Sequence, residues 1–337
     1  MTETVANRKK EGRMSDRGGR RGVGLIGLVL VAVASLAVSG SAFGGGAQGC
    51  GTVVLNENSW TGATSNVYVA KYVLEKRLGC KVKVTTITEG LPAFQAMADG
   101  KIDVVLEDWD NTLTPSNQKY LKNGSVRLAG KLGITGVIGW YIPRYLLQQY
   151  PAFATWRGLK GKEAIFKSPE SGSQGMFLGG DPSYVQKDRA IIKGLGLNFK
   201  HVVAGAEPAQ VARWTQLYKQ KKPVLFYWYD PQYLNATYQL VRIKLPARTA
   251  KCKDDEKAGG DPKQYACEYP SYGLDKLISK KFATGGSSAV AFIKKFNWTS
   301  ADQNTVSNLI AGKKLKPDKA AAQWVKANAA KVNAWLK

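Results

Sequence analysis

The sequence predicts an α/β protein with two lobes and a cleft between them, preceded by an N-terminal export segment. Short apolar strands alternate with amphipathic helices along most of the chain, which is the pattern of a sheet covered by helices. About 290 residues remain after the N-terminal segment, which is more than one hydrophobic core usually holds. The region after residue 247 is mostly helical, and we expect it to return to the first lobe.

The first lobe is predicted to span 51–138 together with 247–337. The run IDVVL at 102–106 is almost entirely apolar, as in a parallel strand that is buried on both faces. Gly79 and Gly100 are placed to end the helices before them. Strands are expected at 52–56, 81–87, 102–106 and near 126–129, and helices at about 63–78, in PAFQAMADG and near 115–123.

The second lobe is predicted to span 139–246, and crossings near Gly139 and Leu245 would form a hinge. Its expected elements are a helix at 144–149, a strand at 163–167, a helix at about 183–194, a strand at 199–204, a helix at 207–219 and a strand at 222–227, and the character of the chain changes after LVRIKLP at 240–246. The C-terminal helices are expected in DKLISKKFA, SAVAFIKKF, SADQNTVSNLIAG and KPDKAAAQWVKANAAKVNAWLK.

Residues 1–49 have the layout of an export signal. All charged residues of this segment lie within 1–21, and the apolar run GVGLIGLVLVAVASLAV and the small residues SGSAFGGGAQG follow. The run is long for a signal peptide but shorter than the about 20 residues of a comfortable membrane span, so an uncleaved membrane anchor is the alternative. We therefore expect an exported protein that works in the periplasm or at the outer face of the cytoplasmic membrane.

The chain is strongly basic, with a formal net charge of +24. Such a charge suits a protein that binds nucleic acid or an anionic surface. However, the basic runs KRLGCK, QKKP, KKFATG and KKLKPDK fall in different predicted elements, and none is interleaved with aromatic residues. We therefore predict a solvated basic surface and no nucleic-acid partner.

The four cysteines predict two disulfides in an exported protein. Cys50 and Cys80 each precede a strand, and the N-terminal ends of neighbouring parallel strands lie side by side. Cys252 and Cys267 flank a charged, glycine-rich excursion and would close its base. Lipidation of Cys50 is the alternative, although AQG is a poor signal for it. Neither a metal nor a cofactor is expected, because no Cys-x₂-Cys pair occurs and the only histidine is His201.

Four aromatic residues stand where predicted strands run out into loops, and such strand ends tend to meet at one cleft. A cleft walled by indole and phenol rings suits an organic cation, above all a quaternary ammonium group. Ordinary core packing is the alternative for these rings. The members of this predicted cage are Trp60, Trp109, Trp140 and Tyr229.

A betaine also carries a carboxylate, which needs hydrogen-bond donors. The turn after the predicted strand 163–167 opens toward a helix, where backbone N–H groups favour an anion. Glu107 and Asp108, beside Trp109, would add negative potential near the cation, with a solvated loop as the alternative. Tyr141 and Trp228 are expected to point away from the cage because side chains alternate along a strand. The candidates for the carboxylate are Ser171, Gly172, Ser173 and Gln174.

Several segments together are similar to those of glycine betaine/proline betaine/choline substrate-binding proteins of ABC importers. The resemblance covers nearly all of the chain after residue 50, and it implies a type II periplasmic-binding-protein fold. It further implies a monomer without enzymatic activity that cages a quaternary ammonium solute, glycine betaine first, and delivers it to an ABC permease. The segments are SWTGATSNVYVAKYVLEKRLGCKV, GKIDVVLEDW, GVIGWYIPRYL, ESGSQG, DPSYV, YDPQY, CEYPSY and NWTSADQNTV.

The chain departs from that family pattern at two positions. Choline-binding relatives tend to carry an acid two residues after the first cage tryptophan, where this chain has Gly62. Betaine-binding relatives often carry a tryptophan in a turn of the second lobe, and the turn 169–175 has none. Choline, carnitine or a sugar is therefore an alternative solute. A glycoside-processing enzyme is less favoured, because the second acid of its carboxylate pair is not identifiable beside Glu107 and Asp108.

Overall fold

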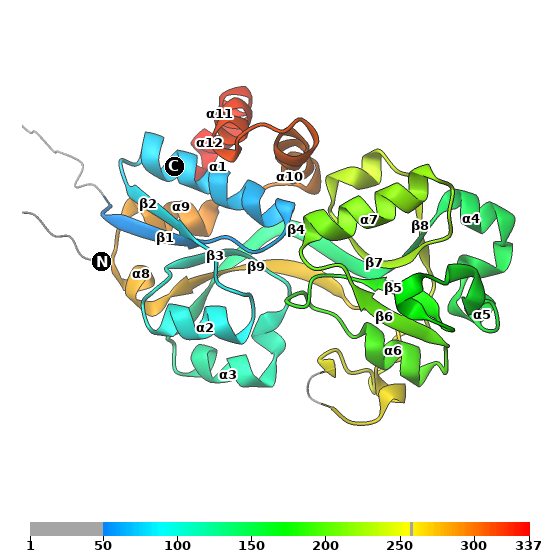
Figure 1. Ribbon diagram of the computed structural model, residues 1–337. Coiled ribbons are helices and arrows are strands. Elements are labelled where there is room, and N and C mark those ends of the chain that lie inside the picture. The colour runs from blue at the N-terminus through cyan, green and yellow to red at the C-terminus, as the bar shows by residue number, and fades with distance from the viewer. Residues whose placement is uncertain (1–49, 257–258) are drawn as a thin grey trace, which may run out of the picture. The chain divides into compact units, whose positions relative to one another are not determined.

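The computed structural model describes residues 50–256 and 259–337. The predicted export segment 1–49 lies outside the described residues. The described chain forms a nine-stranded mixed sheet in the order β2-β1-β3-β9-β4-β7-β5-β6, with β8 paired to β4 (Figure 1). The strands are β1 Thr52–Asn56, β2 Lys81–Thr85, β3 Val104–Asp108, β4 Val126–Pro143, β5 Gly175–Gly179, β6 Phe199–Val203, β7 Leu225–Asp230, β8 Leu240–Ile243 and β9 Ser271–Ser279.

Helices cover this sheet on both faces (Figure 1). The C-terminal helices α10 and α11 pack on α1, so the end of the chain returns to the part of the sheet where the described chain begins. The helices are α1 Thr61–Arg77, α2 Leu91–Ala98, α3 Pro115–Lys122, α4 Arg144–Gln149, α5 Trp156–Leu159, α6 Asp188–Gly194, α7 Glu207–Lys219, α8 Lys280–Thr284, α9 Ser288–Lys295, α10 Ser300–Ser307, α11 Pro317–Ala327 and α12 Ala329–Leu336.

Strand β4 joins the two halves of the sheet. Its early part pairs with β9, and residues 137–141 pair with β7. We call β2, β1, β3 and β9 the first half of the sheet, and β7, β5, β6 and β8 the second half. The strand predicted near 126–129 is the beginning of β4, which extends beyond the predicted end through Gly130 and Gly133. The strand continues through them with positive φ angles of 92° and 93° and with register shifts.

The prediction of a strand at 163–167 was wrong. Residues Glu163–Phe166 form a 3₁₀ turn, and the strand of this region is β5, whose five residues are all buried. Strand β5 runs parallel to both β6 and β7. A short apolar run such as AIF fits a helical turn as well as a strand, and periodicity alone does not separate them. The helix predicted for 183–194 begins only at Asp188.

The segment DKLISKKFA was predicted to be helical, but its first half completes β9, between β3 and β4. Lys276 explains the error, because a lysine in a central strand looks like the polar face of a helix. Its ammonium group is buried and donates to the carbonyl oxygens of Ile293 at 2.8 Å and Lys294 at 2.9 Å, and also to Phe296. These carbonyls belong to the C-terminal end of α9, where a cation is favourable.

Both disulfides join the pairs that the sequence predicts. Cys50 and Cys80 stand before the paired strands β1 and β2, with their Cα atoms 5.0 Å apart. Cys252 and Cys267, with Cα atoms 6.5 Å apart, close the excursion between β8 and β9.

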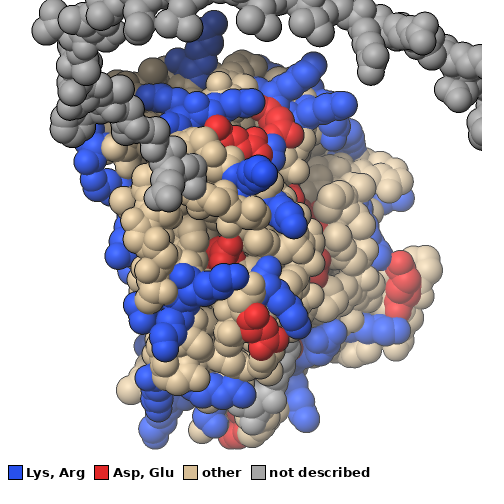
Figure 2. Space-filling model, turned by 90° about the vertical axis from the view of Figure 1, so that its left-hand side faces the viewer, with Lys and Arg blue, Asp and Glu red and all other residues tan. Residues whose placement is uncertain are grey.

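In Figure 2, Lys and Arg side chains are spread over the visible face with fewer acidic groups among them. Among the helices of the described residues, none is both long and apolar enough to cross a membrane.

Candidate functional site

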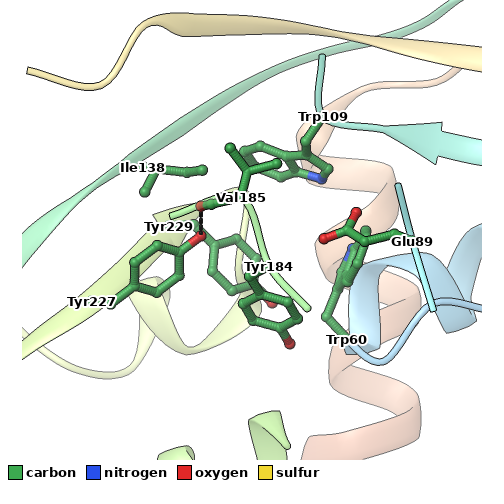
Figure 3. A pocket seen from close by; sticks show the side chains of 8 residues that line it. All are labelled: Trp60, Glu89, Trp109, Ile138, Tyr184, Val185, Tyr227 and Tyr229. Carbon is green, nitrogen blue, oxygen red and sulfur yellow. Dashed lines mark hydrogen bonds between the residues drawn. The ribbon is translucent and has the colours of Figure 1, made fainter. Parts of the chain in front are cut away.

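An aromatic pocket lies where β1, β3, β5 and β7 run toward their carboxyl ends. It is a small hollow, walled mainly by aromatic side chains and partly open to solvent. Trp60 and Trp109 follow β1 and β3, Tyr184 follows β5, and Tyr227 and Tyr229 belong to β7. Eight residues line and define this aromatic pocket (Figure 3): Trp60, Glu89, Trp109, Ile138, Tyr184, Val185, Tyr227 and Tyr229.

The rings from the two halves of the sheet meet edge to face. The centroids of Trp60 and Tyr184 are 5.5 Å apart at an interplanar angle of 89°. Those of Trp109 and Tyr229 are 5.8 Å apart at 85°. Such pairs place the positive edge of one ring against the negative face of the other. These contacts fix the orientation of the rings around the pocket. The faces of aromatic rings attract a cation.

The two indoles are fixed by one buried carboxylate, that of Glu107, which is 2% exposed. The indole Nε1 atoms of Trp60 and Trp109 both donate to its Oε1 at 2.8 Å. Its Oε2 accepts from the side-chain amides of Gln303 at 2.7 Å and of Asn66. Burial raises the pKa of Glu107, and the four N–H donors oppose that effect because they stabilise the ionised form.

The tyrosine side of the pocket has its own buried carboxylate, that of Glu207 at the start of α7. It accepts hydrogen bonds from the hydroxyl groups of Tyr229 and, at 3.5 Å, Tyr184. Gln232 donates to it at 3.4 Å. The hydroxyl of Thr61 also donates to it at 2.7 Å, and Thr61 is the first residue of α1. Glu207 therefore links the tyrosines to the segment that carries Trp60.

Two glycines, which lack a Cβ atom, leave space for the aromatic rings of the pocket. A Cβ atom on Gly136 of β4 would lie 2.3 Å from Cζ3 of Trp109, which is closer than any real contact. A Cβ on Gly180 would lie 2.8 Å from Cδ1 of Tyr227 and 3.1 Å from Cδ2 of Tyr184. The main chain at both positions thus forms part of the support on which these rings pack.

The charges around the pocket are acidic, in contrast to the basic surface. No Lys, Arg or His is among the eight lining residues. Glu89 lines the pocket, and Asp108 is buried beside Trp109. Burial, opposed by hydrogen bonds from Asn111 and Thr112, raises the pKa of Asp108 to about 7. The site therefore favours a positively charged group.

One predicted cage residue, Trp140, does not line the pocket. It is 0% exposed, its Nε1 donates to Oδ1 of Asp188 at 2.7 Å, and its ring lies 4.7 Å from that of Phe177. The prediction assumed that a strand ends at Trp140, whereas β4 continues to Pro143 and pairs there with β8. Ile138, two residues earlier on the same face of β4, reaches the pocket instead.

The predicted carboxylate site, Ser171, Gly172, Ser173 and Gln174, also lies away from the aromatic pocket. This turn precedes β5, whereas Tyr184 and Val185 of the pocket follow it, so the two segments lie at opposite ends of that strand. Ser171 forms a capping box with Ser168, and Gln174 donates to Asn198 at 3.0 Å. The prediction followed from the strand wrongly expected at 163–167, which placed the turn at the wrong end of a strand.

Two of the tyrosines and both anchoring networks were not predicted from the sequence. Tyr227 could have been found, because it precedes Tyr229 by two residues and must share its face of β7. Tyr184 was hidden in a segment that looks like a turn and helix cap. Glu207 looks like an acid that caps a helix, and Gln303 lies 196 residues from Glu107, so no local signal could connect them. Trp228 and Tyr141 do not line the pocket, as predicted, and belong to a separate hydrophobic cluster that contains Trp214.

Comparison with known proteins identifies the family. The family model for the substrate-binding domain of ABC-type glycine betaine transport systems matches residues 51–327. The structure of lactococcal OpuAC, closed around glycine betaine, is 22% identical with a TM-score of 0.65, over 85% of this chain and 99% of that one.

Two further structures have the same fold. A choline-binding protein of an ABC transporter in complex with choline is 18% identical with a TM-score of 0.67, over 85% of this chain and 92% of that one. The glycine betaine/L-proline-binding protein ProX of Borrelia burgdorferi is 18% identical with a TM-score of 0.64, over 84% of this chain and 96% of that one. The chain belongs to the family of substrate-binding domains of ABC-type glycine betaine transport systems and has the periplasmic-binding-protein fold of that family.

Proposed function

We propose that this protein captures a small quaternary ammonium solute outside the cytoplasm in the aromatic pocket and delivers it to an ABC permease. The observation that carries the proposal is the pair of indoles held by Glu107, because the acid under them strengthens the negative potential that a cation meets. A trimethylammonium group accepts no hydrogen bond, and ring faces bind it while excluding water. The protein performs no chemistry on the solute and acts as a monomer.

The proposed mechanism is closure of two lobes, 51–138 with 247–337 and 139–246, over the solute. Two contacts support it, because each joins a segment after β1 to a segment of the second half of the sheet. The hydroxyl of Thr61 donates to Glu207 at 2.7 Å, and the hydroxyl oxygens of Ser59 and Ser183 are 3.4 Å apart. Strand β4 and the return from β8 to β9 connect the lobes and would bend on opening.

The hydrogen bonding of the pocket disfavours a sugar as the solute. A sugar needs many donors and acceptors, but the three tyrosine hydroxyls of the pocket are already engaged. Tyr184 and Tyr229 donate to Glu207, and Tyr227 donates to the carbonyl oxygen of Val185 at 3.1 Å (Figure 3). A glycosidase is disfavoured as well, since Glu107 lies behind the indoles with four donors around it.

A thermal-shift titration of the full-length protein with glycine betaine, choline, proline and maltose tests the proposal. A ligand that binds only the folded state raises the midpoint of unfolding as its concentration rises. We expect a rise with at least one of the two quaternary ammonium compounds and none with maltose. If neither compound shifts a folded, ligand-stripped sample, the assignment to quaternary ammonium solutes is wrong.

A further inference from the structure

The one acidic side chain in the wall of the aromatic pocket is that of Glu89, in the loop between β2 and α2. It is 9% exposed, and Figure 3 shows its carboxylate between Trp60 and Trp109, turned toward the space that the rings enclose. The loop is distant in sequence from Gly62, the position at which an acid was sought. A Cβ atom on Gly62 would lie 3.2 Å from the side-chain amide of Gln303, so this position faces Gln303 and not the pocket.

The carboxylate of Glu89 is almost without protein partners. Within residues 50–256 and 259–337, it accepts one long hydrogen bond, from Nδ2 of Asn111 to Oε2 at 3.4 Å, and it has no ion pair. The contrast with Glu107 is sharp, because Glu107 has four donors at its two oxygens. Glu107 is thus occupied by the protein, whereas Glu89 is free to meet a solute.

The groups that face Glu89 make its charge costly in the empty pocket. Burial, followed by the charges of Asp108 and Glu107, raises the pKa of Glu89 well above its usual range. The only charged side chain that lines the pocket is Glu89 itself, so no lining cation offsets it. A bound cation would relieve this cost, whereas a second carboxylate would add to it.

Resting on the proposed function, we propose that Glu89 makes the aromatic pocket selective for quaternary ammonium solutes that carry no carboxylate, such as choline, over zwitterionic betaines. The rings hold the trimethylammonium group of either solute, so they contribute little to this choice. The choice between the two classes of solute depends on the group at the end opposite the trimethylammonium group. A hydroxyl or another neutral donor there can donate to the ionised carboxylate of Glu89. The carboxylate of a betaine can lie beside Glu89 only while Glu89 keeps its proton, because no lining base offsets two carboxylates.

Isothermal titration calorimetry of the full-length protein with three ligands tests this selectivity. Choline and glycine betaine differ in charge, and the carboxamide of glycine betaine matches the shape of the betaine while remaining a cation. At a pH alkaline enough to ionise Glu89, we expect choline and the carboxamide each to bind at least about tenfold more tightly than glycine betaine, because repulsion between two carboxylates in a site of low dielectric constant reaches that size. This comparison needs no variant, so it does not depend on the folding of one.

The variant Glu89→Gln keeps the shape of the side chain and removes its charge. We expect it to reduce the ratio of the choline and betaine affinities by about tenfold or more, with weaker choline binding and tighter betaine binding. Glu163→Gln is the matched control, because Glu163 is also buried but lies at the amino end of β5 and accepts from the amide of Asn198. The control is expected to leave the ratio unchanged.

The outcomes separate the two proposals. Tighter binding of glycine betaine than of its carboxamide, or an unchanged ratio in a folded Glu89→Gln variant, overturns the role of Glu89 and leaves the quaternary ammonium pocket standing. If none of the three ligands binds, both proposals fall.

Discussion

The tryptophan side and the tyrosine side of the aromatic pocket use the same device with different chemistry. On each side one buried carboxylate orients two rings, Glu107 for the indoles and Glu207 for Tyr184 and Tyr229. The donors to Glu107 are all N–H groups of the first half of the sheet and the helices packed on it. Those to Glu207 are mainly hydroxyls, and one of them, from Thr61, comes from the opposite side of the pocket.

This difference assigns different tasks to the two sides. An indole N–H can only donate, so the tryptophan side requires an acceptor at Glu107 and has one stable arrangement. A hydroxyl can donate or accept, so the tyrosine side can reorganise, and its link to Thr61 is available to break when the lobes open. We infer that the tryptophan side sets the strength of binding and that the tyrosine side responds to closure.

The largest expected effect comes from removing a ring on the tryptophan side. Trp109→Ala should weaken binding of the quaternary ammonium solute by about 10- to 100-fold, because a cation–π contact of about 1.5–3 kcal/mol is lost from a desolvated site. Trp109→Phe should fall between the two, since Phe presents a weaker ring face. Calorimetric titration measures both, and an unchanged affinity in a folded Trp109→Ala variant would remove this ring from the binding site.

Exchanging the two anchoring acids for amides tests the comparison directly. Glu107→Gln should cost about 2 kcal/mol of unfolding free energy, because a glutamine cannot accept at both positions. If its oxygen keeps the two indole N–H groups, its NH₂ group faces the NH₂ groups of Asn66 and Gln303, and if it turns over, its NH₂ group faces the indoles. Glu207→Gln should cost about 1 kcal/mol or less, because the tyrosine and threonine hydroxyls can turn to accept. Urea unfolding of the two variants measures the difference, and equal losses would show that donor chemistry does not distinguish the two sides.

A methyl group behind Trp109 should have a smaller effect. Gly136→Ala is expected to weaken solute binding several-fold, by about 1 kcal/mol, because the new Cβ displaces the indole from its place over β4. Gly139→Ala in the same strand is the matched control. Its Cβ would meet the flexible side chain of Arg242, which can move away, and Cε2 of Tyr141 at an ordinary contact distance of 3.6 Å. Similar affinities for the two variants would argue against a positioning role for Gly136.

The smallest expected effect concerns the dependence of stability on pH. The pKa of Asp108 is about 7 in the folded protein because of burial, against 3.8 without it. Between these values the unfolded state ionises first, so the contribution of Asp108 to stability falls as the pH rises from 3.8 to 7. Asp108→Asn should therefore raise the melting temperature by a few degrees at pH 8, by less at pH 5 and by almost nothing near pH 4.

The exposed Asp99 supplies the control for this pH series. A hydrogen bond from Gln95, followed by one from Lys101, lowers the pKa of Asp99, so its charge is favoured in the folded state. Asp99→Asn is therefore expected to give no gain in melting temperature at pH 8. A gain from Asp108→Asn that is the same at pH 4 and pH 8 would contradict the shifted pKa of Asp108.

Local patterns account for what could be predicted about the fold. Helices α1 and α7 and strands β1 and β3 were predicted because their apolar spacing, their bounding glycines and prolines and their propensities agree. The errors fall where a buried polar or flexible residue contradicts its surroundings. Lys276 in β9, the glycines of β4 and the short run before β5 each owe their conformation to neighbours that are distant in sequence.

The sequence by itself determined the family, from the segments that resemble it, and it determined the cysteine pairs and three of the rings at the pocket, from their places at the ends of strands. Only the tertiary structure decided that Tyr184 and Tyr227 replace Trp140, that 171–174 lie away from the pocket and that Glu89 enters it. It also decided that Glu107 holds two indoles with help from Gln303, 196 residues away. The physical reason is that a buried carboxylate must find its donors wherever the packed chain supplies them, and sequence distance does not enter that requirement.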